Sequence, residues 1–208
     1  MIASQTTECS CKHIVSVSLG SSERNAKSTL QLKGQTFIIE RLGTDGNLQK
    51  ARQLLEELDG RVDALGLGGT DLYVYAGGRR YTFRESAKLI ENVKNTPVLD
   101  GSGLKNSLER ILNNRLAADK IIDFQGKKVL MVCGVDRFGM AEALVANGAD
   151  VTFGDLIFGL NWDHPIKSLQ TLDSFAKLLA PLLTKLPVRW FYPMGAKQSQ
   201  RKPQHQGY

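Results

Sequence analysis

The sequence predicts an α/β protein with two lobes: a mixed-sheet lobe over residues 13–118 and a Rossmann-like parallel α/β lobe over residues 127–192. Three observations lead to this prediction. Strand-like segments alternate along the chain with segments of helical periodicity, which is the pattern of layered α/β folds. Two glycine-containing breaks between β-rich segments indicate hairpins in the first lobe. A continuous apolar segment, residues 128–133, is typical of a strand buried in a parallel sheet.

The first lobe begins with a strand at residues 13–19. Residues 28–33 and 36–42 flank Gly34-Gln35 and are expected to pair as a hairpin. Apolar residues recur at steps of three and four from 47 to 58, which predicts a helix that Asn47 caps and that ends before Gly60. A short buried strand is expected at residues 62–67.

The rest of this lobe contains the strongest hairpin signal of the chain. Residues 71–76 and 79–83 are β-rich and flank Gly77-Gly78. A short helix is expected at residues 84–93 and a strand at 96–100. A longer helix is predicted from Ser102 to Ala118, and the boundary between the lobes at residues 119–128.

The second lobe is predicted as a β-α-β-α-β arrangement. The apolar strand at 128–133 is followed by a helix at 140–147, which Gly148 terminates. A strand at 150–153, an amphipathic helix within 168–183 and a last strand at 188–192 complete it. Residues 1–12 and 193–208 are expected to be disordered, because they lack periodicity or apolar residues. The chain is expected to stop before a further strand and helix of this fold.

The composition narrows the class of protein. Of the 208 residues, 42% are hydrophobic and 23% are charged, so a buried core is expected. No apolar stretch reaches the ~18 residues that cross a bilayer, and residues 1–11 lack the features of a secretion signal. Three cysteines, Cys9, Cys11 and Cys133, cannot build a disulfide framework. We therefore expect a soluble cytoplasmic protein without membrane contact; the oligomeric state is left open.

Most of the net charge of +6 lies near the C-terminus, where residues 161–208 carry seven lysines and arginines against two acids. A basic tail can bind a phosphate backbone, but no helix-turn-helix or zinc-finger spacing accompanies it. The sequence favours a solvated end over nucleic-acid binding. No metal site is predicted, because Cys9, Cys11 and His13 do not have the spacing of a structural zinc site.

Small and polar residues follow almost every predicted strand. Because ligands bind beyond the carboxyl ends of strands in open α/β sheets, these loops are candidates for a shared cleft for a small anionic substrate. The alternative is that turns favour such residues in any protein. The candidate substrate-binding residues are Gly20, Ser21, Ser22, Thr44, Asp45, Gly69, Thr70, Gly101, Ser102 and Gly103.

The turn after the strand at 128–133 has the spacing of a dinucleotide-binding turn. Gly134 and Gly139 take the first and third glycine positions, and Asp155 ends the next strand. Asp136 replaces the middle glycine, and Arg137 beside it could pair with its charge. These five residues are the candidate cofactor site, for NAD or NADP, and Asp155 favours NAD. The alternatives are a turn that only joins strand to helix, or an adenosyl ligand without pyrophosphate.

The helix predicted at residue 102 begins with DGSGLK, residues 100–105. Amide groups at its start, with Lys105 one turn in, would favour an anion or carboxylate. The alternative is that Ser102 merely caps the helix. His164 and His205 are isolated, so no Ser/His/Asp or Cys/His set can be assembled. Cys133 is expected to be a small core residue.

Four segments carry a family resemblance: HIVSVSLGSS (13–22), IERLGTDG (39–46), VDALGLGGTDLY (62–73) and TPVLDGSGLK (96–105). Together they resemble the bacterial quinate 5-dehydrogenases, over residues 13–206. The resemblance implies an oxidoreductase that converts quinate to 3-dehydroquinate with a nicotinamide cofactor. The N-V-T-x-P-x-K and G-A-G-G-A segments of other shikimate and quinate dehydrogenases do not occur, so no catalytic pair carries over by position.

The residues and the resemblance together predict an NAD(P)-dependent dehydrogenase acting on a polyhydroxylated cyclic acid. Lys105 and the amides of residues 101–103 are expected to hold the substrate carboxylate. Asp71, Asp100 or Asp45 would orient hydroxyls or relay a proton, because hydride removal from an alcohol leaves a proton to be accepted. The alternatives are a non-catalytic protein that binds a nucleotide or anionic metabolite, and an inactive fragment of such an enzyme.

Overall fold

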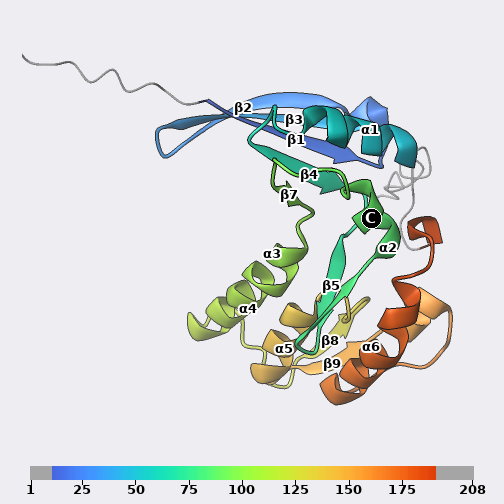
Figure 1. Cartoon of the computed structure of the whole chain (residues 1–208). Coiled ribbons are helices and arrows are strands. Elements are labelled where there is room, and N and C mark those ends of the chain that lie inside the picture. The colour runs from blue at the N-terminus through green and yellow to red at the C-terminus, as the bar shows by residue number, and fades with distance from the viewer. Residues whose placement is uncertain (1–10, 191–208) are drawn as a thin grey trace, which may run out of the picture. The chain divides into compact units, whose positions relative to one another are not determined.

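A computed structural model describes residues 11–190, which form two compact units (Figure 1). The described part of unit 1 is residues 11–70 and 88–99, and that of unit 2 is residues 71–87 and 100–190. The predicted lobe boundary at 119–128 thus falls inside unit 2. The predictions for residues 1–10 and 193–208 lie outside the described residues.

Unit 1 contains a five-stranded mixed sheet in the order β2-β3-β1-β4-β7. Strand β1 pairs in parallel with both β3 and β4, β4 pairs in parallel with β7, and β2 pairs antiparallel with β3. The elements are β1 (Lys12–Ser18), η1 (Ser22–Arg24), β2 (Ala26–Leu32), β3 (Gln35–Gly43), α1 (Leu48–Leu58), β4 (Ala64–Gly68) and β7 (Val98–Leu99). The prediction of a mixed sheet here is confirmed.

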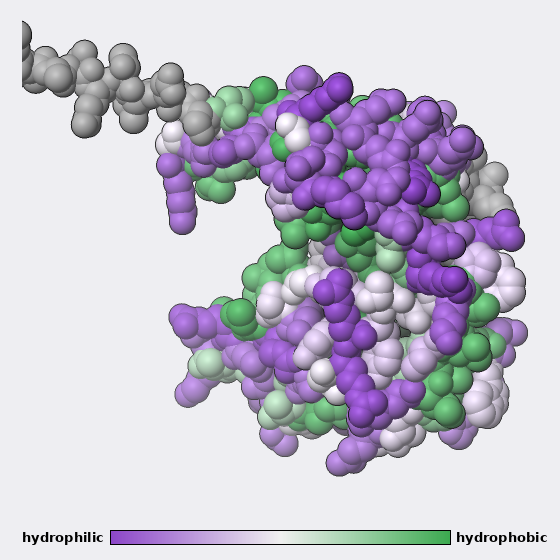
Figure 2. Space-filling model, viewed as in Figure 1, coloured by the Kyte–Doolittle hydropathy of each residue, from purple (hydrophilic) through white to green (hydrophobic). Residues whose placement is uncertain are grey.

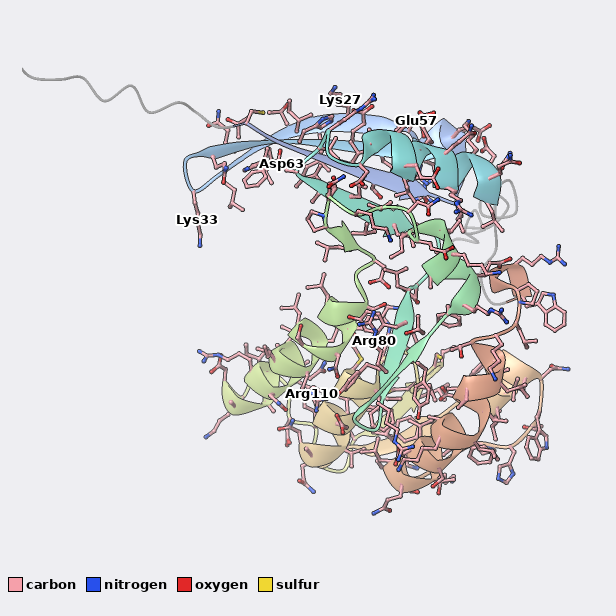
Figure 3. All side chains as sticks on the ribbon, viewed as in Figure 1. Lys27, Lys33, Glu57, Asp63, Arg80 and Arg110 are labelled. Atoms are coloured by element: carbon pink, nitrogen blue, oxygen red, sulfur yellow. The ribbon has the colours of Figure 1, made fainter. Side chains whose placement is uncertain are left out.

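The β2–β3 hairpin turns one residue earlier than the sequence predicts. Its two central residues are Lys33 and Gly34, with φ of 50° and 77°. A two-residue hairpin loop of this type needs positive φ at both positions, and Gln35 is already the first residue of β3. Figure 3 shows Lys33 at this tip, away from the rest of unit 1.

The core of unit 1 lies between the sheet and α1. Val15 and Val17 of β1 alternate with more exposed residues and are almost fully buried, as are Ala51 and Leu55 of α1. Asn47 caps the helix as predicted, because its side chain accepts a hydrogen bond from the Lys50 amide at 2.9 Å. The opposite side of α1 is hydrophilic in Figure 2. The helix therefore follows the amphipathic pattern of the sequence.

Unit 2 joins a hairpin to a parallel pair of strands. The hairpin turns at Gly77-Gly78 as predicted, and β8 pairs in parallel with β9. The elements are β5 (Tyr73–Ala76), β6 (Arg79–Thr82), α3 (Ser102–Asn106), α4 (Leu108–Ala118), β8 (Lys128–Met131), α5 (Phe138–Ala146), β9 (Asp150–Phe153), η2 (Asp155–Gly159), α6 (Leu169–Leu183) and η3 (Val188–Trp190). Helix α2 (Arg84–Leu89) crosses the division between the units.

The predicted helix over 102–118 is wrong in one respect, because it breaks at Ser107 into α3 and α4. Ser107 has a φ of −102° and a ψ of −68°, and both its amide and its hydroxyl donate to the Gly103 carbonyl, at 3.1 and 2.7 Å. Such bonding from a serine to the preceding turn competes with the regular helical pattern and bends the helix.

The predicted strand at 188–192 is also wrong for the described residues 188–190, which form the 3-10 turn η3. Pro187 favours a turn, and the Trp190 amide donates to its carbonyl at 3.0 Å. Apolar and aromatic residues form a strand only where a neighbouring strand is available. Unit 2 therefore contains a β8-α5-β9 unit, and the described residues do not complete the predicted three-strand Rossmann-like half.

Strand β8 was expected to be buried on both faces, and this is wrong. Met131 is buried, but Leu130 and Val132 are 60% and 57% exposed. Only one face of the strand is buried. On that face Met131 belongs to the same core as Val151 and Phe153 of β9 and the buried residues of α5 and α6. None of the helices in residues 11–190 is both long and apolar enough to cross a membrane.

Candidate functional site

Lys105 of α3 lies between two carboxylates in unit 2. Its Nζ atom donates to Asp71 Oδ2 at 2.7 Å and to Asp136 Oδ1 and Oδ2 at 2.8 and 3.0 Å. The side chains of Lys105, Asp71 and Asp136 are 22%, 9% and 26% exposed. We call these three residues the Lys105 triad. Asp71 precedes β5, and Asp136 lies in the turn between β8 and α5.

The triad holds Lys105 as a cation. Burial by itself would lower the pKa of Lys105, but the hydrogen bonds and charges of Asp136 and Asp71 outweigh it, and the pKa is raised above its ordinary value. With both aspartates ionised, the triad carries a net charge of −1. An ammonium group and carboxylates side by side can donate to and accept from a hydroxyl group, whereas a carboxylate ligand meets a negative site.

Asp100, predicted like Asp71 to orient hydroxyls or relay a proton, bonds to Leu72 and Ser102 rather than to Lys105. Its carboxylate accepts hydrogen bonds from the Leu72 amide at 2.5 Å and from the Ser102 amide at 3.1 Å, and it also contacts the Ser102 hydroxyl. That hydroxyl lies 2.8 Å from the Tyr73 carbonyl. Asp100 and Ser102 therefore fasten the start of α3 to the start of β5.

The start of α3 differs from both interpretations of the sequence. Gly101, with a φ of 85°, occupies the capping position, no side chain caps the helix, and Ser102 is already its first residue. The Ser102 amide is taken by Asp100, so the three amides of residues 101–103 do not form an open anion site. Gly103 has space around it, since an added Cβ would only reach the Tyr73 hydroxyl at 3.7 Å.

The turn after β8 is held by Asp155. One carboxylate oxygen of Asp155 accepts from the Gly134 amide and the other from the Val135 amide, each at 2.9 Å. Cys133 Sγ lies 3.5 Å from Asp155 Oδ1. The amides that would cradle a pyrophosphate are therefore bonded to a carboxylate of the chain itself. In this conformation the turn does not fit a dinucleotide pyrophosphate.

Arg137 does not pair with Asp136, the pairing that the sequence suggested. It contacts Glu109 of α4, while Arg110 of α4, labelled in Figure 3, contacts Glu142 of α5. Asp136 has Lys105 as its partner instead. These ion pairs join the start of α5 to α3 and α4.

The two glycines of the turn are required by packing. A Cβ at Gly134 would lie 2.6 Å from the Phe153 ring and 2.8 Å from Leu172. A Cβ at Gly139 would lie 2.7 Å from the Asn106 carbonyl oxygen of α3. Gly139 thus allows the two helices to approach closely at the point where Lys105 and Asp136 meet.

The substitution Gly139→Ala is expected to destabilise the protein by about 1–3 kcal/mol, because a backbone atom of α3 would have to move. Gly103→Ala is the matched control, since it also adds a methyl group to a helix but meets open space. It is expected to be neutral or to stabilise by up to about 1 kcal/mol through helix propensity. Urea unfolding of both variants checks this, and equal effects would contradict the packing role of Gly139.

Cys133 is exposed, contrary to the expectation of a core residue. Although the residue as a whole is exposed, burial of its sulfur and repulsion by Asp155 raise the pKa of the Cys133 thiol to about 12. Because the thiolate is the reactive form, alkylation of Cys133 at pH 8 is expected to be about two orders of magnitude slower than that of exposed Cys11. Asp155→Asn should speed the reaction. Labelling followed by mass spectrometry checks this, and equal rates at both cysteines would contradict it.

The remaining predicted substrate residues lie in unit 1, where parallel strands β3, β1 and β4 end side by side. Their polar groups largely bond to one another: the Ser22 amide donates to Asp45 at 2.7 Å, and Thr44 donates through Oγ1 to the Ser18 carbonyl at 3.1 Å. Gly20, Ser21 and Thr70 are also buried at this edge, next to Gly69. The predicted substrate-binding residues thus fall into two groups, one in each unit.

Two further features of the described residues bear on ligands. None of the groups of histidine, cysteine, aspartate and glutamate in residues 11–190 is arranged to hold a metal ion. An open pocket of about 460 Å³ in unit 2 lies apart from the Lys105 triad. It is lined by Gly77, Phe138, Glu142, Val145, Ala149, Asp150, Val151, Lys167, Ser168, Leu169, Gln170 and Asp173.

Sequence reasoning placed Lys105 and Asp71 together but assigned Asp136 to a cofactor. The sequence gives little indication that Asp136 pairs with Lys105, since the two residues are 31 positions apart. The one visible sign was that an aspartate, Asp136, stands where the motif has a glycine. A partly buried carboxylate needs a cation beside it, and that cation comes from a distant part of the chain.

Two families of domains match the chain, and each is described as a domain of unknown function. DUF8753 matches residues 13–100, and DUF8754 matches residues 103–208, which is more than half of the chain. No curated protein and no solved structure matches it.

Proposed function

We infer that this chain, which belongs to the DUF8754 family of domains of unknown function, provides an acid–base site for a small polyhydroxylated substrate. The Lys105 triad is the observation that carries this inference. Its ammonium lies 2.7–3.0 Å from oxygens of both carboxylates, and the three side chains are at most 26% exposed. Groups of this kind, held in place by mutual hydrogen bonds, are suited to proton transfer.

Lys105 is protonated at neutral pH because its pKa is raised, and its ammonium is held beside two carboxylates, so we propose it as the proton donor. In the reduction of a ketone, Lys105 would give a proton to the oxygen as the alkoxide develops. In the reverse direction, a carboxylate of the triad would accept the hydroxyl proton. The reaction that the resemblance implies, quinate to 3-dehydroquinate, is of this alcohol–ketone type.

The net charge of −1 on the Lys105 triad argues against the predicted role of Lys105 in binding the substrate carboxylate. Lys105 is unsuited to hold the substrate carboxylate, because Asp71 and Asp136 overcompensate its charge. A hydroxyl or carbonyl oxygen is the better partner. Oxidation of an alcohol also needs a hydride acceptor, for which NAD or NADP remains the proposal. Asp155 holds the turn that carries Asp136, so it also helps to position the Lys105 triad.

Turnover of quinate tests this function. Wild-type protein with NAD or NADP is expected to produce reduced nicotinamide when quinate is added. Lys105→Met should lower the rate by at least about 100-fold, the usual contribution of a positioned acid–base group. Lys127→Met, which removes an exposed lysine of the same unit, should leave it unchanged. Turnover by Lys105→Met at the wild-type rate would overturn the proposal.

A second candidate is a protein that binds such a molecule without turning it over. The occupation of the Gly134 and Val135 amides by Asp155 favours it, because a redox cofactor would need another binding mode. Thermal melting separates the two candidates, since a ligand that binds only the folded state raises the melting temperature. A rise with quinate but no turnover with either nicotinamide cofactor would support the binding protein.

A further inference from the structure

Arg41 of β3 is a partly buried arginine without an acidic partner. Its guanidinium donates from Nη1 to the Ser21 carbonyl and from Nη2 to Ser18 Oγ, both at 3.0 Å. Among residues 11–190, no carboxylate lies within ion-pair distance of it. Two of its five N–H groups are thus used by neutral acceptors, and its charge is not balanced locally.

A second arginine increases this imbalance. Burial and the charge of Arg24, at the end of η1, lower the pKa of Arg41 from its ordinary value. Arg24 also has no ion pair within the described part of the chain. The acids nearest in sequence are engaged elsewhere or exposed: Asp45 accepts from the Ser22 amide, and Glu40 lies within 4 Å of His13 and Lys27.

Arg41 lies on the face of the sheet that is opposite to α1. In the parallel register Arg41 is the partner of Ser16, so the two side chains share a face, and Val15 and Val17 point to the other face, toward α1. On the Arg41 face, β4 presents Gly66 and Gly68, where a Cβ would come within 3.1 and 3.0 Å of serine side chains. Ser16 and Ser18 therefore pack closely against these glycines, and Ser18 is one of the two acceptors of the guanidinium.

The loop next to Arg41 is held firmly in place. The Gly43 amide donates to Asn25 Oδ1 at 2.6 Å, and a Cβ at Gly43 would lie only 2.4 Å from the Ser21 carbonyl oxygen. Ser21 is 4% exposed. The loop that accepts a hydrogen bond from Arg41 thus fixes the guanidinium at the carboxyl ends of β1 and β3, the edge where ligands of α/β sheets bind.

We propose that Arg41, assisted by Arg24, binds the anionic group of a small ligand, a carboxylate or a phosphate. An anion would balance two neighbouring positive charges and would accept the N–H groups of Arg41 that Ser18 and Ser21 do not use. This assignment differs from the expectation that Lys105 holds the carboxylate. It also stands apart from the proposed acid–base function, because it requires only binding.

Thermal melting at constant ionic strength tests the anion site. Inorganic phosphate, quinate and uncharged inositol are the three probes. Wild-type protein is expected to melt at higher temperature as phosphate or quinate is added, and to be unaffected by inositol. Arg41→Gln should lose this shift. Arg61→Gln is the matched control, since it removes an exposed arginine of the same unit and should keep the wild-type shift.

The two anion probes identify the ligand chemistry, because a shift with phosphate alone indicates a phosphate site and a shift with quinate alone a carboxylate site. Arg24→Gln is a second test in case Arg41→Gln does not fold, because Arg24 is exposed and its replacement should not disturb the fold. It should reduce the anion-dependent shift while leaving the melting temperature without anion unchanged or higher. An unchanged shift in either variant, or no shift in wild-type protein, would overturn the site. Turnover by Lys105 is not involved in any of these readouts.

Discussion

Lys105→Met is expected to destabilise the protein by about 2 kcal/mol at pH 7, and the loss should depend on pH. The substitution removes the ammonium from between Asp71 and Asp136 and leaves their negative charges facing each other. Breaking a buried ion pair costs about 3–5 kcal/mol, and we expect less here because Lys105 and Asp136 are partly solvated. Lys127→Met is the control and should be within about 0.5 kcal/mol of the wild type.

The pH dependence follows from the raised pKa of Lys105. A group whose pKa is raised on folding contributes stability that is fully present below its unfolded pKa, about 10.4 for lysine, and is lost as the pH rises through the folded value. The stability difference between wild type and Lys105→Met should therefore be constant near neutral pH and shrink above about pH 10. Urea unfolding between pH 7 and 11 measures it. A difference that stays the same above pH 10 would contradict the triad.

Asp155→Ala is expected to have a similarly large effect, about 2–3 kcal/mol. It removes the acceptor of two amides, Gly134 and Val135, each of which costs about 1–3 kcal/mol when it is left without a partner and without water. Asp123→Ala is a control in the same unit, because Asp123 is exposed and accepts from the single amide of Gln125. Its loss should be about 1 kcal/mol or less.

An added anion should compensate for the missing Asp155 carboxylate. Acetate or pyrophosphate is expected to raise the melting temperature of Asp155→Ala more than that of wild-type protein, because it can bind the two vacated amides. Asp155→Asn, which keeps one oxygen acceptor, should show a smaller loss and a smaller response. Stability equal to the wild type in Asp155→Ala would contradict the role of Asp155 in holding the turn.

Local features of this fold were predictable because short-range interactions determine them. Asn47 caps α1 through its side chain, as its position before the apolar pattern predicts, and Gly77-Gly78 supplies the positive φ that its hairpin needs. The predictions were wrong where contacts with the rest of the fold determine the local conformation. Ser107 breaks a regular apolar pattern, and Val188–Trp190 has the composition of a strand but forms a turn.

The candidate site depended even more on distant parts of the chain. The spacing singled out Asp155 as a cofactor ligand, but in the structure its carboxylate accepts from the amides of residues 134 and 135. Arg41 could not be recognised in the sequence at all. It resembles any strand arginine until the structure brings it next to Ser18, Ser21 and Arg24 and leaves it without an acid.

The rate of 3-dehydroquinate reduction by wild-type protein and Lys105→Arg is the most direct test of the central claim, that Lys105 donates a proton. Arginine keeps the positive charge between Asp71 and Asp136, but it holds its proton more tightly than lysine does and is the poorer donor. The account predicts that Lys105→Arg folds and lowers the rate by about 100-fold or more, as Lys105→Met does. A wild-type rate in Lys105→Arg would contradict it, because charge alone would then be sufficient.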